Sequence, residues 1–197
     1  MNKVEIFPDA PITGNGVVAT EFIDRGIDRF IDACRYVFQL PYGYNTDRDD
    51  LLILFKEGFG TCTTKHAVIA TLAEELGLPV VKNIGIYAMT EDIVTGTAEI
   101  LKEFNLPYIP MVHCFLAHAN FRVDLTEGNR NGKNCAIDHF LYTAKVIPNI
   151  TAKDEYRLYR TALKEHVLVR RELQGIDIKR ILQAREKGLV QLKANIT

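Results

Sequence analysis

Apolar residues recur at three- and four-residue spacing in several parts of the chain, and this period is typical of helices that bury one face. The runs cover residues 22–38, 51–56 and 62–76, and helical spacing returns from residue 153 towards the C-terminus. Pro41 lies just beyond the first run, and Gly77 and Pro79 follow the third, as expected where helices end. The pattern therefore predicts three helices in the N-terminal half and a helical C-terminal segment.

Segments between the helical regions are rich in Val, Ile and aromatic residues, which predict strands. These runs cover 80–88, 108–118 and 121–126, with a short helix expected over 98–104. Residues 1–20 carry prolines and glycines that are typical of irregular structure. Helices that precede a largely antiparallel sheet indicate an α+β fold. We expect the 197 residues to form one main domain.

The last two predicted strands are separated by residues 119–120, which suit a two-residue hairpin turn. Such a turn pairs Phe115 with Asp124, and it pairs His113 with Thr126. Because side chains alternate along a strand, His113 and Asp124 then share one face of the sheet as diagonal neighbours. The pattern thus predicts that an imidazole and a carboxylate can meet.

Charge and cysteine content limit the classes of function. The formal net charge is -1 and the pI is near 6.5, so the global charge does not favour nucleic acid or an anionic membrane as a partner. Residues 151–197 hold 11 Lys and Arg against 6 Asp and Glu, which we interpret as a solvated helical face rather than a basic docking surface. The chain has no apolar run long enough for a signal peptide or a membrane span, and it has only four cysteines. These features predict a cytoplasmic protein with reduced thiols.

One of the four cysteines is predicted at the start of a helix. Gly58 and Gly60 break the chain ahead of Cys62, which begins the third helical run. The N–H groups of a first helical turn and the positive end of the helix dipole both stabilise a thiolate. Cys62 is therefore a candidate nucleophile, and His113 and Asp124 are the candidate base and orienting acid. Each of the three residues alone also fits a structural role, and only their combination points to catalysis.

The order of these residues resembles the transglutaminase-like superfamily, with its papain-like Cys-His-Asp core. The resemblance covers roughly residues 25–127 and includes the segments Gly60-Thr61-Cys62, Leu76-Gly77-Leu78-Pro79, His113-Cys114-Phe115 and Asp124-Leu125-Thr126. It departs from the common family pattern at Phe115, where Trp is usual, and at Leu125, where Pro is frequent. It also departs at Thr63-Thr64-Lys65, where acidic residues or Tyr are frequent. The resemblance implies a catalytic domain over 1–150, with N-terminal helices packed on an antiparallel sheet. A helical extension over 151–197 is expected to pack on this core.

The resemblance also implies acyl transfer on a peptide or a small amide-containing substrate. Cys62 would attack the carbonyl group, His113 would act as base and acid, and Asp124 would orient the imidazole. Water or an amine would resolve the thioester, and no metal or organic cofactor is required. The backbone N–H of Cys62 is a natural donor to the oxyanion. The second donor is sought among four upstream polar side chains: Gln39, Tyr42, Tyr44 and Asn45.

Two other functions remain open at this point. The pairs Cys62/His66 and Cys135/His139 each place two zinc ligands at i and i+4, so together they could form a tetrahedral structural site. Alternatively, the domain could keep the fold and serve as a binding or scaffolding module. The apolar stripes of the C-terminal helices could then dock a second copy of the chain or another protein.

Overall fold

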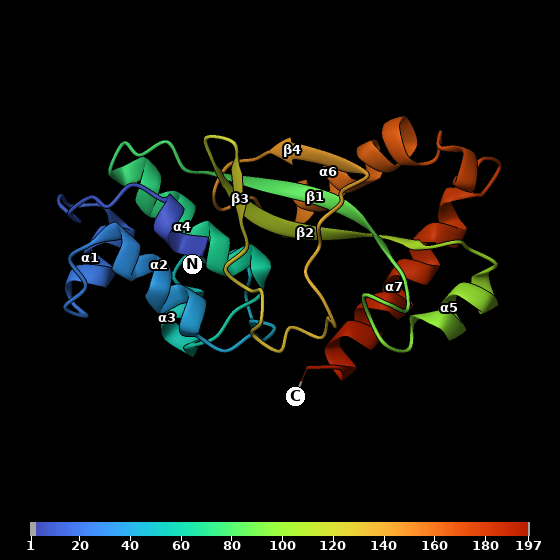
Figure 1. The fold of residues 1–197 in the computed structure, drawn as a ribbon, viewed down its shortest axis with the longest axis horizontal. Helices are drawn as coiled ribbons and strands as arrows, with labels where there is room; N and C mark the ends of the chain where they lie inside the picture. The colour runs from blue at the N-terminus through green and yellow to red at the C-terminus, as the bar shows by residue number, and fades with distance from the viewer. Residues whose placement is uncertain (1–2, 197) are drawn as a thin grey trace. The chain divides into compact units, whose positions relative to one another are not determined.

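The computed structural model describes residues 3–196, and within them the fold is of the predicted α+β class. Seven α-helices are present in this part of the chain: α1 Val17–Ile23, α2 Phe30–Gln39, α3 Ile53–Glu57, α4 Cys62–Glu75, α5 Thr97–Phe104, α6 Ala152–Ala162 and α7 Ile178–Ala194 (Figure 1). The strands are β1 Val81–Met89, β2 Ile109–His118, β3 Phe121–Val123 and β4 Tyr142–Lys145. Short helical turns of other types cover Lys3–Ile6, Leu163–Val167 and Arg171–Leu173. No helix among the described residues is long and apolar enough to cross a membrane.

The four strands form one antiparallel sheet in the order β3-β2-β1-β4. The β2–β3 hairpin has the predicted register, because His118 pairs with Phe121 and Leu116 pairs with Val123. Ala119 takes a positive φ of 50° in the connecting turn. The predicted two-residue turn is therefore confirmed, although β3 ends at Val123 and leaves Asp124 just beyond the strand.

The described residues divide into two compact units. The first unit takes its residues from 3–84, 114–129 and 145–151, and the second from 85–113, 130–144 and 152–196. Each unit has its own cluster of buried apolar side chains.

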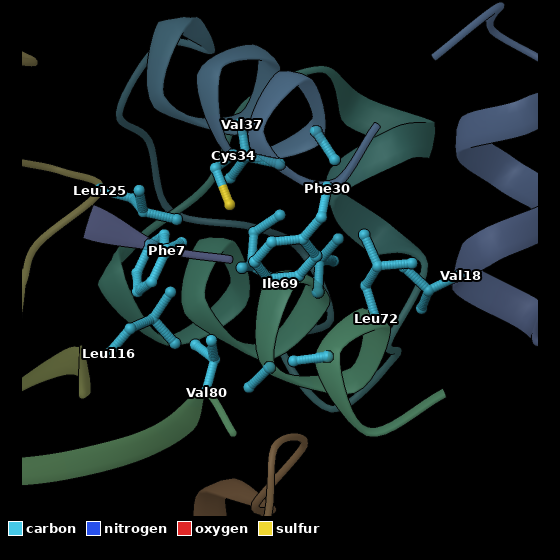
Figure 2. Packing of buried hydrophobic residues seen from close by; sticks show 14 of the residues in the cluster. Phe7, Val18, Phe30, Cys34, Val37, Ile69, Leu72, Val80, Leu116 and Leu125 are labelled. Carbon is cyan, nitrogen blue, oxygen red and sulfur yellow. The ribbon is translucent and has the colours of Figure 1, made fainter. Parts of the chain in front are cut away.

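The core of the first unit lies between α1, α2 and α4. Ile69 and Leu72 of α4 meet Phe30 of α2 and Val18 of α1 (Figure 2). The ring of Phe7 contacts that of Phe30 edge to face, with centroids 6.0 Å apart. These helices bury their apolar faces against α4 and so fix the helix that begins at Cys62.

The single helix predicted over 22–38 is wrong, because this segment forms the end of α1 and then α2. Gly26 separates the two helices and takes a φ of 73°, which favours glycine. The backbone of Arg29 then forms an isolated bridge with Pro11 before α2 begins. A glycine in a left-handed conformation ended the helix although the apolar spacing continued through it.

The core of the second unit is built mainly by helices from the C-terminal segment together with β1 and β2. Tyr159 of α6 is buried and donates a hydrogen bond to the carbonyl of Pro110 at 2.8 Å. Burial raises the pKa of this phenol. Gly188 allows α7 to pack closely against Met89 at the end of β1, since an added Cβ would lie 2.7 Å from Cε of Met89. Residues of the predicted extension thus share a core with residues 85–113, which lie in sequence between the first two stretches of the first unit.

Candidate active site

Cys62 is the first residue of α4, as predicted, and 8% of its surface is exposed. Gly58 ends α3 with a φ of 72°. A Cβ at Gly60 would lie 2.5 Å from the hydroxyl oxygen of Thr64, so only glycine fits this turn without a shift. The sequence therefore delivers the thiol to a helix N-terminus, where backbone N–H groups and the helix dipole stabilise negative charge.

A loop from α2 to α3 is hydrogen bonded to the segment just before Cys62. The N–H of Gly60 donates to the carbonyl of Pro41 at 3.1 Å, and the N–H of Gly43 donates to the carbonyl of Gly60 at 3.3 Å. Tyr42 lies between these two bonds, and its ring meets that of Tyr44 edge to face at 6.2 Å. Both tyrosines therefore lie on the loop that is hydrogen bonded to Gly60, two residues before Cys62.

Asn45 fixes this loop through three hydrogen bonds. Its amide nitrogen donates to the Glu57 carboxylate and to the carbonyl of Phe59, both at 2.8 Å. Its amide oxygen accepts from the hydroxyl of Thr64 at 2.8 Å. Because both amide hydrogens are used within the fold, Asn45 is not an oxyanion donor. Gln39, Tyr42 and Tyr44 remain from the predicted set.

His113 lies within β2 and is almost fully buried, with 2% of its surface exposed. Its ring meets that of Tyr87 edge to face, with centroids 6.5 Å apart. Both residues belong to the second unit, whereas Cys62 and Asp124 belong to the first. Cys114, which follows His113, is buried in the first unit, and its Sγ lies 3.7 Å from the hydroxyl of Thr63 in the first turn of α4.

Asp124 lies directly after β3 and contacts α4 at His66. Its Oδ1 accepts hydrogen bonds from the N–H and the hydroxyl of Thr126, at 2.8 and 2.7 Å. The same oxygen is 3.5 Å from Nε2 of His66, and that nitrogen accepts the N–H of Leu125 at 2.8 Å. Through this hydrogen bond the buried His66 links α4 to the chain after β3.

Two buried lysines near the first turn of α4 were not singled out by the sequence. Nζ of Lys65 donates to the carbonyls of Phe38 and Leu40, at 3.2 and 2.8 Å. Nζ of Lys82 donates to the carbonyls of Thr63 and Pro148, at 3.0 and 2.9 Å. The sequence did contain a signal for the burial of Lys82. It occupies the same face of the predicted strand as Ile84 and Ile86, which are buried.

Burial changes the electrostatics of one of these lysines. It lowers the pKa of Lys65 to about 8, while the charge of Asp124 acts in the opposite direction. Asn129 donates to the same two carbonyls as Lys65, at 2.6 and 2.8 Å. The end of α2 therefore joins the first turns of α4 to the segment that follows Asp124.

The described residues contain no cluster of three or more potential metal ligands. Cys62 and His66 lie in the first unit, and Cys135 is an exposed residue of the second. The first turn of α4 offers a thiol at a helix N-terminus, where the helix dipole favours negative charge.

No protein-family model, curated protein or solved structure matched this chain.

Proposed function

We propose that this protein is a cysteine-dependent acyl-transfer enzyme with a transglutaminase-like, papain-like core. Cys62 is the nucleophile, His113 the general base and acid, and Asp124 the orienting carboxylate. The observation that carries the proposal is the position of Cys62 as the first residue of α4, a helix of 14 residues.

The reaction begins when the thiolate of Cys62 attacks the carbonyl carbon of an amide or ester. A carbon–sulfur bond forms, and the bond to the leaving group breaks as His113 transfers a proton to the departing nitrogen or oxygen. Water or an amine then attacks the thioester, gives its proton to His113 and releases the thiolate. A peptide or a small amide is the substrate class that this chemistry serves.

The oxyanion of the tetrahedral intermediate is stabilised by backbone N–H groups at the start of α4. A second donor comes from the loop that is hydrogen bonded to Gly60. Of its residues, Tyr42 and Tyr44 carry hydroxyl groups, and both are held beside the segment before Cys62. Losing one such donor typically costs about 3 kcal/mol of transition-state stabilisation.

The proposal is tested with an activated ester, p-nitrophenyl acetate, by mass spectrometry of the intact protein and of its peptides. The expected result is an acetyl group on Cys62 in the wild type, released on longer incubation. His113→Gln should slow acetylation about a hundredfold or more, since general base catalysis contributes at least this much. Asp124→Asn should slow it less.

The exposed Cys135 provides a matched control, because a surface thiol can react with the ester without any catalytic machinery. Cys135→Ser should leave acetylation of Cys62 unchanged. Acetylation confined to Cys135, or an equal rate at Cys62 in the wild type and in His113→Gln, would overturn the proposal. A binding module would then be the better interpretation.

A further inference from the structure

Lys82 places a buried amino group beside the first turn of the nucleophile helix. It lies in β1 and is almost fully buried, although β1 is otherwise typical of an apolar strand. Its Nζ donates to the carbonyl of Thr63 at 3.0 Å and to the carbonyl of Pro148 at 2.9 Å. Thr63 is the residue next to Cys62, so the ammonium group is held one residue from the thiol along the chain.

A buried ammonium group is costly unless polar groups solvate it. The two carbonyls provide part of this solvation, and both lie in the first unit with Lys82. Because the effective dielectric constant inside a protein is below that of water, a positive charge at the carbonyl of Thr63 is less screened from the neighbouring residue Cys62 than it would be in solvent. It favours the charged thiolate over the neutral form.

We propose that Lys82 is a positioning residue whose ammonium group holds the first turn of α4 and stabilises the thiolate of Cys62. This inference rests on the proposed function, in which Cys62 is the nucleophile. Lys82 takes no part in bond making or breaking. It keeps the nucleophile in its reactive form at neutral pH, in addition to the effect of the helix dipole and of His113.

Other titratable groups surround the same turn and are unchanged when Lys82 is replaced. Within the first unit, α4 carries Lys65 and His66, the end of α3 carries Glu57, and the strands and the segment after them contribute Cys114 and Asp124. His113 is the proposed base. A difference between Lys82 variants therefore reports the charge of Lys82 itself.

The test measures the pKa of Cys62 from the ultraviolet absorption of its thiolate, after subtraction of a Cys62→Ser titration. Lys82→Gln keeps a donor for the carbonyls and removes the charge, and Lys82→Met removes both. Each should raise the pKa of Cys62 by about one pH unit or more, as expected for a buried charge at short range. Lys82→Arg, which keeps the charge, should stay within a few tenths of a unit of the wild type.

Lys145→Met is the matched control, because Lys145 is an exposed lysine at the end of β4 and its loss changes the net charge equally. It should leave the pKa of Cys62 unchanged. Thermal unfolding shows which variants are folded. If only one of Lys82→Gln and Lys82→Met is folded, the pKa of Cys62 in that variant is sufficient for the test. An apolar replacement of a buried charge is often tolerated, so Lys82→Met supports the test if Lys82→Gln unfolds.

Failure of this inference can be told from failure of the proposed function. If the wild-type thiol already titrates near an ordinary pKa of ~8.5, both are overturned. If the wild-type pKa is lowered but is the same in Lys82→Gln or Lys82→Met, the role of Lys82 is overturned and the nucleophile stands. A shift of equal size in Lys82→Arg would assign the effect to packing rather than to charge.

Discussion

At the scale of single residues, Lys65 shows how a buried amine is held by distant backbone groups. Its side chain is fully buried on α4, and its partners are the last carbonyls of α2. The C-terminal end of a helix carries partial negative charge, which compensates part of the cost of burying an ammonium group. Burial still dominates, because it lowers the pKa of Lys65 to about 8.

This pKa predicts a dependence of stability on pH. In the unfolded chain Lys65 titrates near the ordinary lysine pKa of 10.5, so between pH 8 and 10.5 the unfolded state binds more protons than the folded state. The contribution of Lys65 to the free energy of unfolding therefore rises with pH across this interval, by up to about 3 kcal/mol. Urea denaturation at pH ~7 and ~10 gives the free energy of unfolding of the wild type and of Lys65→Met. The wild-type value minus the variant value should increase from pH ~7 to pH ~10 by this amount.

Lys145→Met serves as the control for this experiment, because Lys145 is exposed. The difference in stability between this variant and the wild type should stay constant with pH. A difference between wild type and Lys65→Met that is flat, or that falls with pH, would contradict the burial of a charged amine at this position.

The two buried lysines also mark where the sequence stops being informative about the site. A lysine usually lies at the surface, so residue type alone assigns Lys65 and Lys82 to solvent, and only the strand spacing of Lys82 indicates burial. Their acceptors are carbonyls of Phe38, Leu40, Thr63 and Pro148, most of them distant in sequence. Backbone carbonyls carry no sequence signature. Cys62, in contrast, could be placed from its neighbours, because glycines and a helix start are local features.

At the scale of elements, α1 is held at its N-terminus by a side chain from the end of α4. The carboxylate of Glu75 accepts the N–H groups of Val18 and Ala19, at 3.0 and 2.8 Å. A Cβ at Gly16 would lie 2.2 Å from Cδ of Glu75, so glycine makes room for this contact. Glu75 thus replaces the local cap that α1 lacks.

Removing this cap should destabilise the first unit. Glu75→Ala leaves two helix N–H groups without their acceptor and should cost about 1–3 kcal/mol. Glu75→Gln keeps one acceptor oxygen and should cost less. Urea denaturation measures both variants, and hydrogen exchange at Val18 and Ala19 localises the effect. Glu74 is the exposed neighbour, and Glu74→Ala should have little effect.

Equal losses of stability for Glu74→Ala and Glu75→Ala would show that the capping bonds contribute nothing.

The cap could not be found from the sequence, because Glu75 and Val18 are far apart along the chain. The hairpin could be found, since the two residues of its turn fix the register of β2 and β3 by themselves. The break at Gly26 was missed because periodicity records burial, which continues from α1 to α2.

At the scale of the whole molecule, the α+β class follows from the order of helical and strand patterns. The division into two units does not follow in the same way. Every amphipathic face predicts burial, but periodicity does not say which faces share a core. Residues from three separate stretches build the first unit, and only the folded chain reveals that they belong together.

The core of the first unit offers a test with neighbouring residues of the same type. Val18 is fully buried and meets Leu72 (Figure 2), whereas 56% of the Val17 surface is exposed. Val18→Ala removes two buried methyl groups and leaves a space, so it should cost roughly 2 kcal/mol. Val17→Ala should change stability by less than about 0.5 kcal/mol.

Cys34 reports on the opening of this same core. It is buried within the cluster, and burial raises the pKa of its thiol, so it reacts with disulfide reagents only when the unit opens. A loss of 2 kcal/mol corresponds to roughly thirtyfold faster labelling in Val18→Ala. Val17→Ala should label at the wild-type rate. Equal labelling rates in the two variants would mean that α1 is not part of the cooperative core, because the pair differs only in which methyl groups are buried.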